Sequence, residues 1–380
     1  MNNFVYYNPT RIVFGKGTIA ELGKLVPTNA RVLMTYGGGS IKRNGVYEQV
    51  KVALAGRTLV EFGGIQPNPL YETLMEAVAV AKQERIDFLL PVGGGSVLDG
   101  TKFIAAAARF QGGDPWQILT GASVTVALPI GAVLTLPATG SESNGFAVIS
   151  RKSTQEKLAF GSEATYPQFA VLDPQTTFSL PAKQVRNGIV DAFAHVMEQY
   201  ATYPANAALQ DRQAEAILLT LIEEGPRTLA SMNDYDARAN FMWAATQALN
   251  GLIGMGVPQD WSTHMIGHEV TAFYGLDHAE TLAIVMPQVL RHQRERKAAK
   301  LRQFAQRVWN IGGGDLVEAG VSRMEQFFHS IGMPTRLSDY GISAADAAKK
   351  ISERFAARNV RHGEHGDLDA QAVKEILLKC

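Results

Sequence analysis

The chain is poor in several features that would mark particular classes of protein. Among 380 residues there is one cysteine, Cys380, so no disulfide can close within the chain. We therefore expect a reducing location such as the cytoplasm. Lys and Arg together number 36, as do Asp and Glu, which leaves no excess of positive charge. This balance argues against nucleic acid and anionic membrane surfaces as partners.

Long hydrophobic runs are also absent. The longest apolar stretch, residues 124–138, contains Pro129 and Pro137 and is too short to span a bilayer. The first seven residues lack the basic start and apolar run of a secretory signal. We therefore expect no membrane insertion. Hydrophobic residues nevertheless make up 46% of the chain, and this length and composition predict two globular domains or one large mixed domain.

The first half of the chain alternates between strand and helix patterns. Such alternation with short connections is typical of an α/β fold in which helices cover a parallel sheet. A short hairpin or edge strand is expected within residues 5–14. The expected strands are residues 31–36, 58–62, 88–92, 124–136 and 168–172, and the expected helices are residues 41–55, 71–84 and 97–110.

After Pro181 the pattern becomes helical. We expect an α/β domain over residues 1–180 and an all-α domain over residues 181–380. The expected helices are residues 185–200, 206–224, 236–250, 262–273, 281–292 and 298–309, followed by three more.

Two identical glycine-rich segments each follow a predicted strand: Gly37-Gly38-Gly39-Ser40 and Gly93-Gly94-Gly95-Ser96. Glycine at such a turn lets backbone N–H groups approach an anion, and the N-terminus of a following helix adds partial positive charge. A single segment of this kind is more often only a tight turn, and neither segment has the Gly-x-Gly-x-x-Gly spacing of the common dinucleotide fingerprint. Two such loops at the carboxyl ends of neighbouring strands favour a ligand site.

The first loop also carries information about the ligand. An NAD site commonly places a carboxylate where it accepts from the ribose 2′-hydroxyl and repels a 2′-phosphate. Residues 36–41 contain no acid, and Lys42 and Arg43 follow directly. If this loop faces the adenosine end of a dinucleotide, the sequence predicts NADP(H) rather than NAD(H).

The strongest pattern lies in the helical half. Asp191 and His195 are four residues apart, as are His264 and His268, so each pair projects from one helix face, and His278 follows shortly after. A single histidine on an apolar helix is usually part of a core. Asp191, however, would be a buried carboxylate with no cation at helical spacing, and a divalent metal ion is an economical partner for it. Imidazole and carboxylate ligands suit Zn²⁺ or Fe²⁺, and the missing His-Glu-x-x-His argues against a metalloprotease.

With these motifs the chain resembles the iron-containing (group III) alcohol dehydrogenase family over nearly its whole length. The resemblance rests on Gly93 to Lys102, the Pro67-Asn68-Pro69 turn, Asp191-x-x-x-His195, and His264-x-x-x-His268 followed by His278. Within the family the chain is most similar to NADPH-dependent aldehyde reductases of broad substrate range. This similarity is carried by residues 36–40, 135–144 and 257–261.

The resemblance implies an N-terminal Rossmann-like domain and a C-terminal helical domain, with cofactor and metal in the cleft between them. It assigns the metal to Asp191, His195, His264 and His278, and it makes His268 a further active-site histidine that is not a ligand. The expected cofactor contacts are Gly37, Gly38, Gly39, Ser40, Asn68, Gly94, Gly95, Ser96, Asp99, Thr135, Thr139 and Lys157.

The resemblance further implies reversible reduction of short- to medium-chain aldehydes to primary alcohols, a homodimer, and zinc in preference to iron. We expect the substrate to meet apolar side chains, and the candidates are Phe146, Ile149, Leu252, Ile253, Met255 and Trp261. Two alternatives remain. A polyol or sugar-phosphate dehydrogenase, or a dehydroquinate-synthase-like lyase, could use the same architecture, but residues 251–281 contain no Lys or Arg for a phosphate. The second alternative is a non-catalytic protein that binds a nucleotide or a metal ion.

Overall fold

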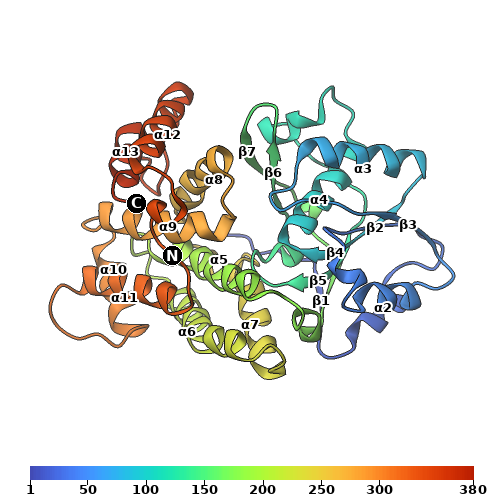
Figure 1. Cartoon of the computed structure of the whole chain (residues 1–380), viewed down its shortest axis with the longest axis horizontal. Helices are drawn as coiled ribbons and strands as arrows, with labels where there is room; N and C mark the ends of the chain where they lie inside the picture. Colours follow the sequence, from blue (N-terminus) through green and yellow to red (C-terminus); the bar gives the residue numbers. More distant parts are fainter. The chain divides into compact units, whose positions relative to one another are not determined.

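The computed structural model describes residues 1–380, which form two compact units (Figure 1). The sheet unit comprises Tyr7–Val185 and Ser231–Asn250. The helical unit comprises Met1–Tyr6, Arg186–Ala230 and Gly251–Cys380. None of the helices combines the length and the hydrophobicity that crossing a bilayer would require.

The sheet unit is built on six strands in the order β1-β8-β5-β4-β2-β3, and every neighbouring pair is parallel. This confirms the expected parallel sheet. The short edge strand near the N-terminus is also confirmed, although it begins only at Arg11. The expected strand from residue 124 is wrong in its first half, because β5 begins at Gly131, after Pro129, which has no N–H for a ladder. The strands are β1 Arg11–Phe14, β2 Arg31–Thr35, β3 Thr58–Phe62, β4 Phe88–Gly94, β5 Gly131–Leu136 and β8 Phe169–Leu172.

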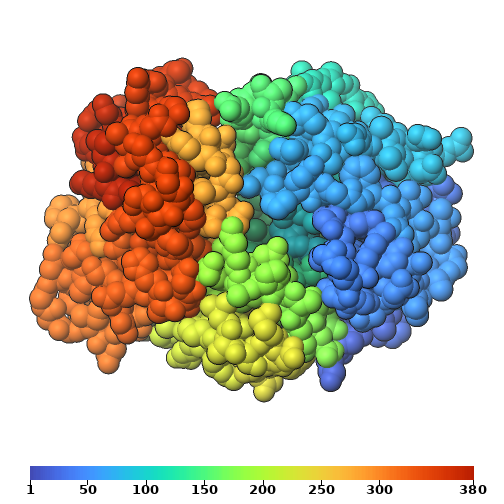
Figure 2. Space-filling view, in the orientation of Figure 1, coloured from blue at the N-terminus to red at the C-terminus, as the bar shows by residue number.

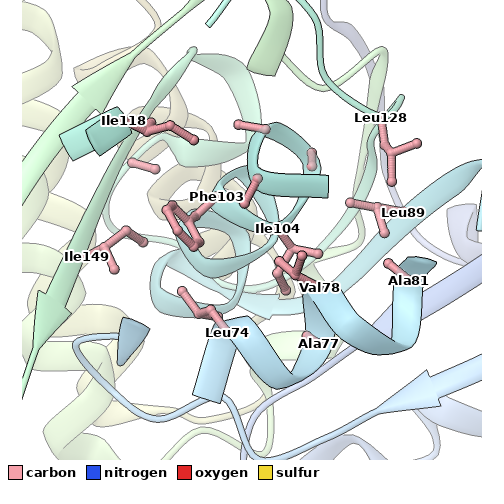
Figure 3. Close-up of a cluster of buried hydrophobic side chains, with 14 of the residues drawn as sticks. Leu74, Ala77, Val78, Ala81, Leu89, Phe103, Ile104, Ile118, Leu128 and Ile149 are labelled. Carbon is pink, nitrogen blue, oxygen red and sulfur yellow. The ribbon is translucent and has the colours of Figure 1, made fainter. Parts of the chain in front are cut away.

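Helices cover both faces of this sheet. Leu33 points to one face, where it joins a core with α3 (Tyr71–Gln83) and α4 (Gly95–Arg109). Figure 3 shows part of this core, with Leu74 and Val78 of α3 beside Phe103 and Ile104 of α4. Val32 and Met34 point to the opposite face and pack with α1 (Leu22–Leu25) and α2 (Val46–Ala53). The alternation follows from the period of two in a strand.

An antiparallel hairpin of β6 (Phe146–Arg151) and β7 (Glu156–Gly161) was not expected from the sequence. Its connection has no glycine at the position that needs positive φ. Gln155 takes that conformation instead, with φ 51°. Ala147, Ile149 and Phe160 anchor the hairpin in the core of α3 and α4.

The second half of the chain is helical, as expected from the sequence. The α7 helix belongs to the sheet unit, where Met242 packs against Leu98, Leu134 and Leu172. Each compact unit therefore consists of segments from separate parts of the chain. The division into domains at residue 180 stays a prediction. The helices are α5 Ala182–Tyr200, α6 Ala208–Ala230, α7 Tyr235–Ala248, α8 Ser262–Tyr274, α9 His278–His292, α10 Ala298–Arg307, α11 Leu316–Ser330, α12 Ala344–Arg358 and α13 Ala370–Leu377.

One core of the helical unit joins α8 and α9 to the last two helices through side chains such as Ile266, Ile284, Phe355 and Ile376. The C-terminal residues, which include α12 and α13, are coloured red in Figure 2 and are exposed on the surface of the helical unit. The core fixes α8 against α9, and these two helices carry three of the histidines singled out from the sequence.

Candidate active site

Four side chains singled out from the sequence converge in the helical unit. Asp191 and His195 lie on α5, His264 lies on α8, and His278 is the first residue of α9. Each offers one potential ligand atom, and these atoms all lie within 4.8 Å of one another. The first three side chains are buried and that of His278 is 23% exposed.

The spacing within this cluster fits one shared ion better than a set of hydrogen bonds. Nδ1 of His195 lies 3.8 Å from Oδ2 of Asp191, and Nε2 of His278 lies 3.5 Å from Oδ1. Ligand atoms about 2.1 Å from one ion are separated by roughly 3–4 Å. Nδ1 of His195 is buried without a hydrogen-bond partner, and burial lowers the pKa of this imidazole well below its usual range. A neutral ring with an available lone pair is the form that binds a cation.

His268 lies beside the cluster without belonging to it. Its ring centre is 5.3 Å from that of His278 and 6.3 Å from that of His264. Trp261 also packs against the cluster, with ring centres 5.3 Å from His264 and 6.3 Å from His195. Its contact with the substrate stays a prediction.

A carboxylate that the sequence analysis did not single out supports His264. Glu198 on α5 is 5% exposed, and its Oε2 is hydrogen-bonded to Nδ1 of His264. Its Oε1 accepts from the backbone N–H of Thr263 at 2.6 Å. Burial and the neighbouring Asp260 raise the pKa of Glu198, whereas the α8 N–H groups and the Lys297 ammonium lower it and favour the ionised carboxylate. Its position three residues after His195, on the same helix face, was the available sequence signal.

The sheet unit brings the two glycine loops together at one edge of the sheet. Strands β2 and β4 are direct neighbours and run parallel, so the loops that follow them share the carboxyl edge. The helix α4 begins at Gly95, directly after β4. A Cβ on Gly95 would lie 2.6 Å from the Thr139 side chain, and one on Gly94 would lie 2.8 Å from Cβ of Leu136. Only glycine fits at these two positions.

The first loop differs from expectation. The helix predicted from residue 41 is wrong at its start: a three-residue 3₁₀ turn, Ser40–Lys42, follows Gly39, and α2 begins at Val46. Gly45 has φ 82°, a left-handed conformation that interrupts the helix. Lys42 is also paired, because its Nζ lies 2.9 Å from Oε2 of Glu61 on β3. The loop itself contains no acid, but the adjacent strand β3 supplies Glu61, which the sequence of the loop could not reveal.

The remaining predicted cofactor residues cluster in the same unit. Thr135 lies at the end of β5, and Thr139 contacts the start of α4. The Lys157 ammonium donates to Oδ1 of Asn68 at 2.8 Å, which joins the β6–β7 hairpin to the turn before α3. Asp99 on α4 accepts from the Ser141 hydroxyl at 2.7 Å and from the Val148 N–H at 3.0 Å.

One candidate for lining the substrate pocket is placed elsewhere. Ile149 is fully buried in the core that the sheet unit forms with α3 and α4, so it is a core residue. Its position in an unrecognised hairpin explains the wrong expectation, because alternate residues of a hairpin strand face the core.

Comparison with known proteins identifies the family. A model described as iron-containing alcohol dehydrogenase matches residues 9–174, and the C-terminal model of the same family matches residues 186–380. The chain belongs to the iron-containing alcohol dehydrogenase family. It is 56% identical to the NADPH-dependent aldehyde reductase YqhD of Escherichia coli K12, over 99% of each chain. It is 41% identical to a probable NADH-dependent butanol dehydrogenase of Bacillus subtilis, again over 99% of each chain.

The chain also has the fold of this family. The crystal structure of YqhD from E. coli K-12 matches with a TM-score of 0.97 and 55% identity, over 99% of this chain and 98% of that one. The protein is therefore an oxidoreductase of the alcohol dehydrogenase type with a cluster suited to a metal ion. Its relatives are named for different nicotinamide cofactors. Membership of the family alone thus leaves the cofactor to be argued from the residues of this chain.

Proposed function

We propose that the protein reduces short- to medium-chain aldehydes to primary alcohols with NADPH, in a reversible reaction that depends on a divalent metal ion. The observation that carries the proposal is the convergence of Asp191, His195, His264 and His278, whose ligand atoms lie within 4.8 Å of one another. The similarity to an NADPH-dependent aldehyde reductase over 99% of the chain supports the choice of reaction.

The four residues of this cluster would hold the ion through one carboxylate oxygen and three imidazole nitrogens. Such a mixed set suits Zn²⁺ and Fe²⁺, and we propose zinc. When bound, the ion supplies Lewis-acid polarisation of the carbonyl oxygen. Four protein ligands leave a position for substrate only if the coordination number exceeds four or if one ligand is loose. His278 is the most exposed of the four and the first residue of its helix, which makes it the best candidate for a loose ligand.

The sheet unit would bind the cofactor, which when bound supplies the hydride. The N–H groups of Gly94, Gly95 and Ser96 at the start of the 15-residue helix α4 would contact the pyrophosphate. We propose that Asp99 faces a ribose and that Thr135, Thr139, Asn68 and Lys157 line the rest of the site. Gly37 to Ser40 would approach the adenosine end, with Lys42 near the 2′-phosphate.

We propose that His268 acts as the general acid that protonates the substrate oxygen during aldehyde reduction. Its imidazole lies next to the cluster and outside the ligand set. It can therefore hold a proton for the oxygen of the substrate as the alcohol forms. The apolar surroundings provided by Trp261 would discriminate only weakly between short- and medium-chain aldehydes, because each methylene contributes about 1 kcal/mol.

The decisive experiment measures metal content and turnover together. Dipicolinate treatment should remove the ion and abolish NADPH oxidation with butanal, and added Zn²⁺ or Fe²⁺ should restore it. Full activity of the metal-free protein would refute the proposal. Binding of metal and NADPH without turnover on aldehydes of graded length would favour a non-catalytic protein instead. Comparison of zinc- and iron-loaded protein then tests the choice of metal.

We further propose a homodimer. Phe14 at the end of the edge strand β1 and Trp243 on α7 are both exposed, and their rings lie edge to face 6.1 Å apart. An exposed edge strand flanked by aromatic side chains is a natural contact for a second copy. Light scattering of the purified protein tests this: twice the monomer mass is expected, and a monomer at micromolar concentration contradicts it. We also propose a cytoplasmic location, because the single cysteine, Cys380, can form no disulfide within the chain.

A further inference from the structure

Glu198 lies between a backbone N–H and a histidine ring nitrogen of α8. Its two carboxylate oxygens have different partners: Oε1 accepts from the Thr263 backbone N–H at 2.6 Å, and Oε2 is bonded to Nδ1 of His264. The side chain is buried on α5, one helical turn beyond His195. One carboxylate therefore touches the helix that carries His264 and also the ring of His264 itself.

The surroundings hold this carboxylate in place. The backbone carbonyl of Glu198 accepts from the Asp260 N–H at 2.8 Å, and Asp260 in turn accepts from the Ser262 N–H at 2.8 Å at the start of α8. The fully buried Lys297 pairs with Asp260 at 2.8 Å. The start of α8 is thus tied to the end of α5. The N-terminal partial charge of this 13-residue helix favours a negative group at that point.

The contact with Nδ1 decides which nitrogen of His264 can bind a cation. A neutral imidazole carries one proton, and a carboxylate next to Nδ1 holds that proton there. Nε2 then keeps its lone pair and is the atom that His264 offers to the cluster. Carboxylates that bond the second nitrogen of a ligating histidine fix the ring orientation and raise its basicity in many metal sites.

We propose that Glu198 is a positioning residue for the metal site: it fixes the tautomer and the orientation of His264. The inference rests on the proposed metal-dependent function and adds a residue outside the four ligands. The competing explanation is that Glu198 only caps α8 through Thr263. The two explanations differ in what they predict for metal affinity.

The variant Glu198→Gln separates them, because glutamine has one acceptor where glutamate has two. Both carboxylate positions face N–H donors, so the amide NH₂ must oppose either Thr263 or His264. If it faces His264, the ring has to move its proton to Nε2 and loses its lone pair for the ion. We expect Co²⁺ affinity, measured by competition with a chelator, to fall about 10- to 100-fold. The visible spectrum of the Co²⁺-loaded variant should also change.

Glu215→Gln is the matched control. Glu215 on α6 is a buried carboxylate of the same unit that accepts from the Tyr200 hydroxyl at 2.9 Å and from the Gln303 amide at 2.9 Å. Its replacement should leave Co²⁺ affinity and spectrum at wild-type values. Wild-type affinity and spectrum in both Glu198→Gln and Glu198→Ala, which leaves no acceptor for Nδ1, alongside loss of Co²⁺ in His264→Ala, would overturn the proposal and leave Glu198 as a helix cap. A wild-type protein that binds no divalent ion would instead refute the proposed function.

A measurement on the wild-type protein keeps the inference testable should Glu198→Gln fail to fold. In ¹⁵N-histidine spectra of the Zn²⁺-loaded protein, assigned with a His264→Gln variant, Nδ1 of His264 should carry the proton and Nε2 the metal. The reverse assignment would contradict the role of Glu198.

Discussion

Lys42 and Glu61 form an ion pair beside the first glycine loop, with Nζ 2.9 Å from Oε2. Lys42 also lies over the rings of Tyr36 and Tyr47, 4.9 and 4.7 Å from their centres. The hydroxyls of both tyrosines bond Glu61. We infer NADP(H) from the positive charge of Lys42, and this charge is balanced by Glu61 on β3.

We expect Lys42 and Glu61 to affect cofactor choice in opposite directions. Lys42→Met should lower kcat/KM for NADPH about tenfold through loss of a charged contact to the 2′-phosphate, with NADH little affected. Glu61→Gln should raise the preference for NADPH by removing a repelling charge. Steady-state kinetics with both cofactors measure this, and Lys51→Met is the control, because Lys51 lies over the same Tyr47 ring from α2. If the ratio of kcat/KM for NADPH to kcat/KM for NADH is unchanged in both variants, the 2′-phosphate does not bind near Lys42.

Gly38→Ala should separate cofactor binding from folding. An added Cβ at Gly38 meets nothing within 4 Å, whereas one at Gly95 meets Thr139 at 2.6 Å. The free energy of unfolding of Gly38→Ala should stay within about 0.5 kcal/mol of wild type, while Gly95→Ala loses stability. If the first loop approaches the cofactor, Gly38→Ala should nevertheless raise KM for NADPH. Chemical denaturation and kinetics on the same preparation check both points, and an unchanged KM would argue against contact.

His268→Ala should lower turnover without loss of the ion. The ring lies outside the group of potential ligand atoms, so metal content should remain at the wild-type level. Removal of a general acid should lower kcat about 100-fold or more. Metal analysis and NADPH oxidation distinguish this result from that of His264→Ala, which should lose both, and His292→Ala on α9 serves as a control. Loss of metal from His268→Ala would make His268 a ligand.

The buried Lys102 should make the free energy of unfolding depend on pH. It is fully buried on α4, where it donates to Ser141, Asn144 and the Phe146 carbonyl, and burial lowers its pKa to about 8 against opposing Asp99 and Glu142. The unfolded chain, with a pKa near 10.5, then binds more protons than the folded chain between these values. Stability contributed by this group therefore rises with pH across that window, by about 3 kcal/mol at most.

The measurement is the difference in free energy of unfolding between wild type and Lys102→Met, taken from about pH 8 to pH 10.5. Wild type should gain relative to the variant as pH rises, because other titrating groups are common to both proteins. A difference that is constant with pH would show that Lys102 titrates alike in the folded and unfolded states.

The parallel sheet, the helical second half and the candidate metal ligands could be predicted from the sequence pattern, and the family resemblance selected four of those candidates. Hydrophobic periodicity follows from local geometry, and the spacing of Asp191 and His195 puts them on one helix face in any context. Only the folded structure shows which distant groups meet: Glu61 reaches Lys42 through the pairing of β2 with β3, and Glu198 reaches His264 through the packing of α5 with α8. No local pattern encodes such contacts, because each depends on how separate elements bury their apolar faces together.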